Sequence, residues 1–240
     1  MAGHSQFKNI QHRKNAQDAK KGKVFTKLIK EIAVAVREGG GPDIDSNPRL
    51  RTALQNARGA NMPKDVFERA VKKAAGDGEA AMETINFEAY GPEGSAIMVE
   101  AATDNNTRTV ANIRSYFNKH GGNLGKEGCL QFIFTRKGVF TLEKILKISE
   151  DDFMLEIIDS GAEDVEIGEE FINIICEKDR FGDVSKKLSE MKLEPKESGL
   201  QWMPNDTKKI SEKAQAAVAK LIDVLEEDDD VLKVYHNVEL

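Results

Sequence analysis

The first third of the chain carries apolar residues at intervals of three and four, which is the period of an amphipathic helix. A first helix is predicted over residues 25–36, and the run Gly39-Gly40-Gly41-Pro42 ends it. Asn47-Pro48 and Asn61-Met62-Pro63 are typical helix starts, because Asn caps a helix and proline fits its first turn. Three short helices joined by short turns predict a small bundle.

From about Phe87 the pattern changes to that of β-strands. Strands are predicted at residues 96–101 and 130–134, with a helix at 107–120 between them. Residues 138–204 then follow the order strand, helix, strand, strand, helix, strand, which is the split βαβ plan of ferredoxin-like domains. The segments of this unit are expected at 138–142, 150–160, 164–167, 171–176, 184–191 and 199–203. In its first helix, the expected inward side chains are Phe153, either Leu155 or Ile157, and Ile158.

The end of the chain determines the predicted domain organisation. A helix near 208–225 precedes a last strand at 231–238, and this strand needs a sheet to pair with. The nearest candidate is the middle sheet, so the fold class is α+β with three domains: a helical bundle with a basic arm, a discontinuous α/β domain, and an inserted ferredoxin-like βαββαβ domain. The expected boundaries are 1–23 for the arm, 24–76 for the bundle, 79–136 plus 205–240 for the discontinuous domain, and 137–204 for the inserted domain.

Composition limits the class of protein. Of the 240 residues, 40% are hydrophobic and 32% are charged, which suits packed cores with a solvated surface. No segment approaches the roughly 20 consecutive apolar residues of a membrane span, and the first residues lack the apolar stretch of a secretory signal. Two cysteines cannot build a disulfide framework, so buried free thiols and a cytoplasmic location are expected.

Charge divides the chain unevenly. Residues 1–75 hold 16 Lys and Arg against 7 Asp and Glu, a net charge of +9. The remaining residues hold 19 basic and 34 acidic side chains, a net charge of −15. The basic part should attract polyanions, while the acidic part should repel them and orient the complex.

The basic part predicts binding to nucleic acid. Residues 1–30 carry eight basic side chains against one acid, and each that neutralises a phosphate releases a counterion. Rings interleaved with these charges can stack on exposed bases. The alternative is a solvated tail, which the charge division disfavours. The predicted nucleic-acid-binding residues are His4, Phe7, Lys8, His12, Arg13, Lys14, Lys20, Lys21, Lys23, Lys27, Lys30, Arg49, Arg51, Arg58, Lys64, Arg69, Lys72 and Lys73.

The helix starts at Asn47-Pro48 and Met62-Pro63 have free N–H groups that favour phosphate oxygens, although ordinary capping is the favoured interpretation. Gln55 and Asn56 lie on the second helix with its arginines, but the sequence does not indicate which side chain, if any, reaches a base.

Motifs along nearly the whole chain resemble those of the YebC/PmpR family. They include Gly3-His4-Ser5, His12-Arg13-Lys14, Asn47-Pro48-Arg49-Leu50-Arg51, Asn61-Met62-Pro63-Lys64-Asp65, Tyr90-Gly91-Pro92, Thr103-Asp104-Asn105, Gly121-Gly122-Asn123-Leu124-Gly125 and Val234-Tyr235-His236-Asn237. Phe7 stands where the family usually has Trp. The resemblance implies a three-domain cytoplasmic protein without catalysis. It implies a DNA-binding transcriptional regulator or a ribosome-associated translation factor, and does not choose between them.

A possible second contact region comprises Asp104, Asn105, Arg108, Gly121, Gly122 and Asn123. For the glycines a helix end and a tight turn is the favoured alternative. The histidines are scattered and no cysteine pair has ligand spacing, so no metal site, cofactor or small-molecule substrate is predicted. The acidic run Glu226–Asp230 is interpreted as a solvated linker. Three hypotheses remain: a DNA-binding regulator, a translation factor bound to ribosomal RNA, and a protein-interaction module.

Overall fold

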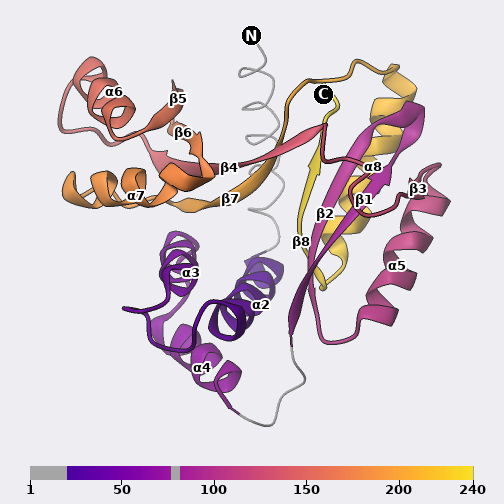
Figure 1. Ribbon diagram of the computed structural model, residues 1–240, viewed down its shortest axis with the longest axis horizontal. Helices are drawn as coiled ribbons and strands as arrows, with labels where there is room; N and C mark the ends of the chain where they lie inside the picture. The colour runs from indigo at the N-terminus through magenta and orange to yellow at the C-terminus, as the bar shows by residue number, and fades with distance from the viewer. Residues whose placement is uncertain (1–20, 77–81, 240) are drawn as a thin grey trace.

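The computed structural model describes residues 21–76 and 82–239 of the chain. Its first unit consists of the helices α2 (Lys21–Glu38), α3 (Pro48–Gly59) and α4 (Lys64–Ala74). Their apolar stripes meet in one core, formed by residues such as Ile32, Leu50 and Phe67. The predicted bundle is therefore present, and it lies at the lower left in Figure 1, beneath α7 and β7.

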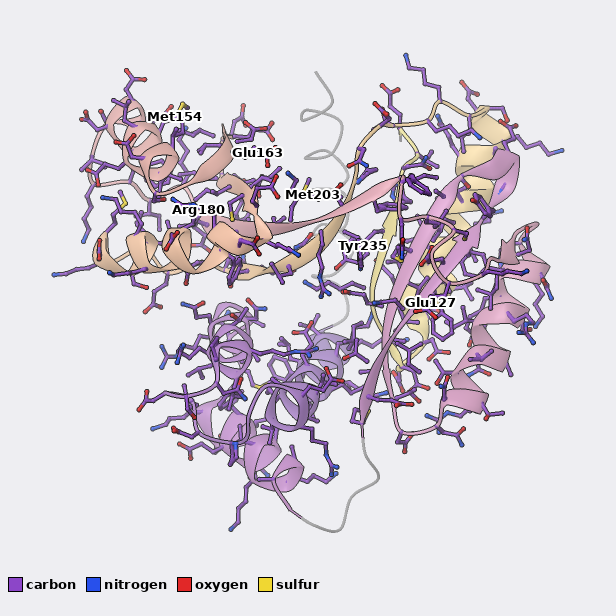
Figure 2. The ribbon with its side chains drawn as sticks, in the orientation of Figure 1. Glu127, Met154, Glu163, Arg180, Met203 and Tyr235 are labelled. Atoms are coloured by element: carbon purple, nitrogen blue, oxygen red, sulfur yellow. The ribbon has the colours of Figure 1, made fainter. Side chains whose placement is uncertain are left out.

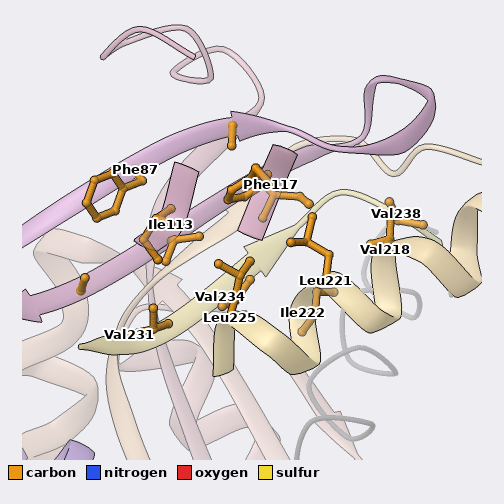
Figure 3. Close-up of a cluster of buried hydrophobic side chains, with 14 residues drawn as sticks. Phe87, Ile113, Phe117, Val218, Leu221, Ile222, Leu225, Val231, Val234 and Val238 are labelled. Atoms are coloured by element: carbon orange, nitrogen blue, oxygen red, sulfur yellow. The ribbon is translucent and has the colours of Figure 1, made fainter. Parts of the chain in front are cut away.

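The second unit is a four-stranded antiparallel sheet with two helices on one face. The strands β1 (Glu83–Tyr90), β2 (Ala96–Thr103), β3 (Asn123–Leu124) and β8 (Val231–His236) have the order β3-β1-β2-β8. The helices α5 (Asn106–Lys119) and α8 (Glu212–Glu227) cover it (Figure 1) and bury Phe117 and Leu221 against Val234 (Figure 3). A short 3-10 helix, η1 (Pro92–Gly94), joins β1 to β2.

The third unit contains β4 (Phe134–Glu143), α6 (Glu150–Asp159), β5 (Ala162–Ile167), β6 (Phe171–Glu177), the short 3-10 helix η2 (Lys178–Arg180), α7 (Phe181–Glu190) and β7 (Glu197–Pro204). Its sheet is antiparallel with the order β5-β6-β4-β7, which is that of the split βαβ plan. The core holds Phe140, Phe153 and Ile174. The predicted α+β fold class is confirmed, and β8 pairs with β2 as the last strand was expected to.

The strand predicted at 130–134 is wrong. Residues 130–133 form turns, and Phe134 is the first residue of β4; the amides of Ile133 and Phe134 both donate to the carbonyl of Leu130. Leu130 and Phe134 are buried, whereas Phe132 between them is 90% exposed. Burial at positions i and i+4 is typical of a helical turn. The alternation of residues 130–134 that predicted a strand therefore reflects this turn.

Two further expectations need correction. Ile158 of α6 was expected to point inward, but it is 48% exposed. Phe153 fills the core as expected, and of the alternatives Leu155 and Ile157 it is Ile157 that is buried. The helix expected from residue 208 begins at Glu212, because Ser211 caps it through its hydroxyl. Lys208 instead forms a bridge with Val238 beside the end of β8.

Candidate nucleic-acid interface

Part of the predicted interface lies outside the described residues: His4, Phe7, Lys8, His12, Arg13, Lys14 and Lys20. Lys21 is the first residue of α2, and its side chain is not described. The remaining predicted residues lie on α2, on α3 and on α4 or just beside them. Figure 1 places these three helices together on one side of the molecule.

Lys23, Lys27 and Lys30 of α2 face the acidic segment at the end of α8. Nζ of Lys23 donates to the carbonyl of Glu227 at 2.8 Å, and Nζ of Lys30 lies 2.6 Å from Oδ1 of Asp230. The side chain of Lys30 is 16% exposed. These ammonium groups therefore already have oxygen partners within the chain.

Asp230 is the centre of this contact, and it is buried. Its carboxylate accepts from Lys30, from Nη2 of Arg108 at 3.0 Å and from the hydroxyl of Thr109 at 2.7 Å. Burial alone would raise the pKa of Asp230, but the hydrogen bonds from these three groups outweigh it, and the net pKa is lowered. An ionised Asp230 thus joins α2 to β2, α5 and β8.

Lys27 lies between the two bonded lysines and is half-buried. Burial lowers the pKa of Lys27, and the charge of Lys23 lowers it further, although Glu226 and Glu31 oppose this shift. A partly desolvated ammonium with acidic neighbours is a weak ligand for an external phosphate. Lys23, Lys27 and Lys30 are therefore mainly internal contacts.

The expectation that Glu226–Asp230 is a solvated linker is wrong. Glu226 and Glu227 end α8, and Asp230 is buried. Asp228 accepts a hydrogen bond from the hydroxyl of Tyr116 at 3.0 Å. Burial, together with this hydrogen bond, raises the pKa of Tyr116 to about 12. The acidic run was misinterpreted because sequence does not show which carboxylates meet cations from distant segments.

On α3, one face packs against the rest of the protein. Asn56 is buried, its Nδ2 donates to the carbonyl of Ser198 at 2.9 Å, and its Oδ1 accepts from the amide of Ser198 at 2.8 Å. A Cβ on Gly59 would lie 2.0 Å from the carbonyl oxygen of Lys196, so α3 approaches β7 closely there. Asn56 thus holds α3 to β7 and does not face a base.

The two predicted helix starts differ. Asn47 is buried, caps α3 by accepting from the amide of Leu50 and donates to the carbonyls of Ala35 and Gly41. Capping is therefore the correct interpretation for this start. Pro63 precedes α4 and makes no side-chain cap.

Arg49 and Arg51 bind groups of their own chain. Arg49 pairs with Glu38 and donates to the hydroxyl of Thr84, while Arg51 donates to the carbonyls of Ile44 and Asp45. Both guanidinium groups are exposed, so they keep donors on the solvent side but are fixed in position.

The remaining basic residues form the open basic face, which we define as Arg58, Lys64, Arg69, Lys72 and Lys73. All five are exposed. Lys64 and Arg69 make surface ion pairs with Glu68 and Asp65, one helical turn away, which water screens strongly. Within the described chain, Arg58 and Lys72 form no ion pair. This face can neutralise phosphates at little cost.

The possible second contact region has mainly structural roles. Asn105 caps α5 by accepting from the amide of Arg108, and Arg108 binds both Asp104 and Asp230. Gly121 has a φ of +76° at the end of α5, where a side chain would be strained. A Cβ on Gly122 would lie 2.6 Å from the carbonyl oxygen of Tyr90. The turn interpretation of these glycines therefore holds, while Asn123 pairs with Tyr90 in the sheet.

Sequence reasoning missed a cavity of about 470 Å³ between α2, α3, β7 and β8, which has charged side chains in its lining. Glu31, Glu100, Arg136 and Lys233 are among its lining residues. Burial raises the pKa of Glu31. Burial alone would lower the pKa of Lys233, but the charges of Glu197 and Glu31 outweigh the burial, and the net pKa of Lys233 is raised. The mixed charges do not favour a polyanion. In the sequence, the cavity could have been inferred from a charged residue within a mainly apolar strand, such as Glu100 in β2.

The comparisons with known proteins agree with this architecture. Residues 5–77 match the TACO1/YebC protein N-terminal domain, and residues 82–238 match the TACO1/YebC second and third domain. The chain belongs to the TACO1/YebC family. The resemblance noted from the motifs is thereby confirmed.

Relatives cover the whole length of the chain. A protein of Bacillus licheniformis is 50% identical over 99% of this chain and 100% of its own length, and YrbC of Bacillus subtilis is 47% identical over 99% of both chains. Each is named a "probable transcriptional regulatory protein". The crystal structure of a conserved hypothetical protein from Aquifex aeolicus matches with a TM-score of 0.83 and 43% identity, covering 92% of this chain and 91% of that one.

Within residues 21–76 and 82–239, no helix is long and apolar enough to cross a membrane. The same residues contain no cluster of three or more His, Cys, Asp or Glu side chains placed to hold a metal ion.

Proposed function

We propose that this protein is a non-enzymatic regulator of gene expression that binds nucleic acid in the cytoplasm, with DNA as its target. The observation that carries the proposal is the open basic face, which continues the charge of the basic residues 1–23 along the sequence. The names of the TACO1/YebC relatives support a regulatory role. Salt-dependent phosphate contacts supply the affinity.

The geometry favours contact with the phosphate backbone over sequence reading by α3. Asn56 and Gly59 lie against β7, so this side of α3 is not free to enter a major groove. On α4, Asp65 and Glu68 lie among the basic residues. If α4 entered a groove of the DNA, these two carboxylates would approach the DNA phosphates and be repelled. Specificity, if the target is DNA, then depends on residues 1–23 or on the shape of the duplex.

The second candidate is a translation factor bound to ribosomal RNA. It is favoured because the open basic face has only five defined side chains, while residues 76–240 of the same chain have a net charge of −15. A long bare duplex would pass close to those acids, whereas folded RNA can present phosphates locally.

The test measures binding of the full chain to duplex DNA and to a folded RNA of equal charge, by fluorescence anisotropy over a range of salt. The variant Arg58→Ala with Lys72→Ala should weaken binding about tenfold and reduce the salt dependence by about one to two phosphate contacts. The matched control is Lys213→Ala with Lys220→Ala, which removes the same charge from exposed sites on α8.

Tighter binding to promoter DNA than to random duplex supports the DNA target. Tighter binding to folded RNA, with the protein co-sedimenting with ribosomes at low salt, supports the second candidate. Equal losses in the α3–α4 variant and in its α8 control would contradict both.

A further inference from the structure

An apolar surface is exposed on the ferredoxin-like unit, at α6 and the loop before it. Among the described residues, six large apolar side chains are exposed, and four of them lie between residues 145 and 158. Ile145 is 66% exposed, Leu155 is 62% exposed, and Ile148 and Ile158 are also exposed. We call these four residues the α6 surface. Exposed apolar residues gathered in one short segment of the chain are typical of interaction sites.

Helix geometry explains why no described part of the chain covers this surface. Phe153 and Ile157 are four residues apart and fill the core, while Leu155 and Ile158 are three apart and lie on the other side of α6. In Figure 1, α6 lies at the end of its unit, away from β8 and from the helices of the second unit. Figure 2 labels Met154 of α6 and Glu163 of β5 at this same end.

The surroundings of the α6 surface are strongly acidic. Residues 143–170 contain 11 Asp and Glu and two Lys, a net charge of −9, while the whole chain has −6. Lys144 pairs with Glu150, and Lys187 of α7 pairs with Glu156. Asp151 and Asp159 are exposed and form no ion pair within the described chain. The neighbouring strand β5 is an edge of its sheet and adds further carboxylates.

We propose that the α6 surface is a docking site for a basic amphipathic segment of another protein. The apolar residues of such a segment would cover Ile145, Leu155 and Ile158, and its Lys or Arg side chains would pair with Asp151 and Asp159. This arrangement is a helix laid against an apolar face with a charged rim. The proposal is independent of the nucleic-acid target, because the open basic face lies on different helices.

Charge disfavours nucleic acid, anionic lipid and a symmetric dimer as occupants. Nucleic acid and anionic lipid carry the same sign as the surface and would be repelled. A symmetric pair of copies of this chain would place the same acidic patch against itself, since a two-fold interface is self-complementary. A cationic amphipathic partner would both reduce the repulsion among the carboxylates around the α6 surface and cover its apolar side chains.

The experiment uses the full chain and a synthetic helical peptide with one leucine face and one lysine face, titrated while methyl signals are followed by NMR. Signals of Ile145, Leu155 and Ile158 should shift. Leu155→Ser with Ile158→Ser, or Asp151→Asn with Asp159→Asn, should each weaken binding at least about tenfold. The matched controls are Phe132→Ser, which is 90% exposed elsewhere, and Glu212→Gln with Asp223→Asn on α8.

A peptide of the same composition, scrambled so that no faces form, should bind at least about tenfold more weakly. Nucleic-acid affinity of the variants should stay unchanged, which separates this result from the proposed function. Equal binding by the variants and the wild type, or shifts confined to other regions, would overturn the proposal. So would self-association of the wild type that the Leu155 and Ile158 substitutions abolish, because the partner would then be a second copy.

Discussion

Lys23 and Lys30 of α2 and the open basic face of α3 and α4 are both runs of basic residues in the sequence, but they differ in what they contact. Lys23 and Lys30 donate to oxygens at the end of α8, and Asp230 holds Lys30 in a buried ion pair. Arg58 and Lys72 project into solvent. The charge of a basic segment therefore overstates its capacity for phosphate, because part of that charge stabilises the contact between units. Four predictions test this difference, in order of expected effect.

Asp230→Asn should cause the largest effect. It removes the anion that compensates Lys30 and Arg108 in a buried place, so the free energy of unfolding should fall by about 3 to 4 kcal/mol, measured by urea denaturation. The control is Asp229→Asn, an exposed neighbour, which should change little. If both variants have equal stability, Asp230 does not hold α2 in place. Nucleic-acid affinity should not decrease, since Lys30 would be released.

Asn56→Ala should have the next largest effect. The backbone amide and carbonyl of Ser198 would lose their partners in a buried place, and the free energy of unfolding should fall by about 2 kcal/mol. Gln55→Ala is the matched control, because Gln55 precedes Asn56 on the same helix and is only half-buried. A loss of nucleic-acid affinity without a loss of stability would show instead that Asn56 faces the ligand.

Acid should weaken the contact at Asp230. The pKa of Asp230 is lower in the folded chain than in the unfolded chain, where it is about 3.9. Its contribution to stability is therefore present above about pH 4 and is lost as the pH falls through the folded pKa. Between pH 6 and the acid range, the free energy of unfolding should fall more in the wild type than in Asp230→Asn. The measurement is urea denaturation of both proteins, repeated at steps of about one pH unit. Parallel curves would refute this linkage.

Lys27→Met should have the smallest effect. The pKa of Lys27 is already lowered by burial, and a methionine of similar length keeps the packing, so stability should change by less than about 1 kcal/mol. Nucleic-acid affinity should change less than in the variant of Arg58 and Lys72. If Lys27→Met lowered nucleic-acid affinity as much as Arg58→Ala with Lys72→Ala does, Lys27 would belong to the nucleic-acid interface.

The pattern of the sequence determined the elements and the fold class. Helical periods, caps and proline positions predicted α2 to α4, and the order of elements predicted the βαββαβ unit, because these signals arise from neighbours in the chain. The family motifs agreed with them. The pattern at 130–134 misled because burial of Leu130 and Phe134 satisfies more than one geometry.

Only the tertiary structure decided which charges are available. Asp230 meets Lys30 across 200 positions, and Asn56 meets Ser198 across 142. Such pairs depend on how whole units pack. The local sequence around an acidic residue does not indicate whether its carboxylate faces water or a buried lysine. The sequence therefore determined the total charge and the secondary structure, while packing between distant segments divided that charge into internal contacts and free surface.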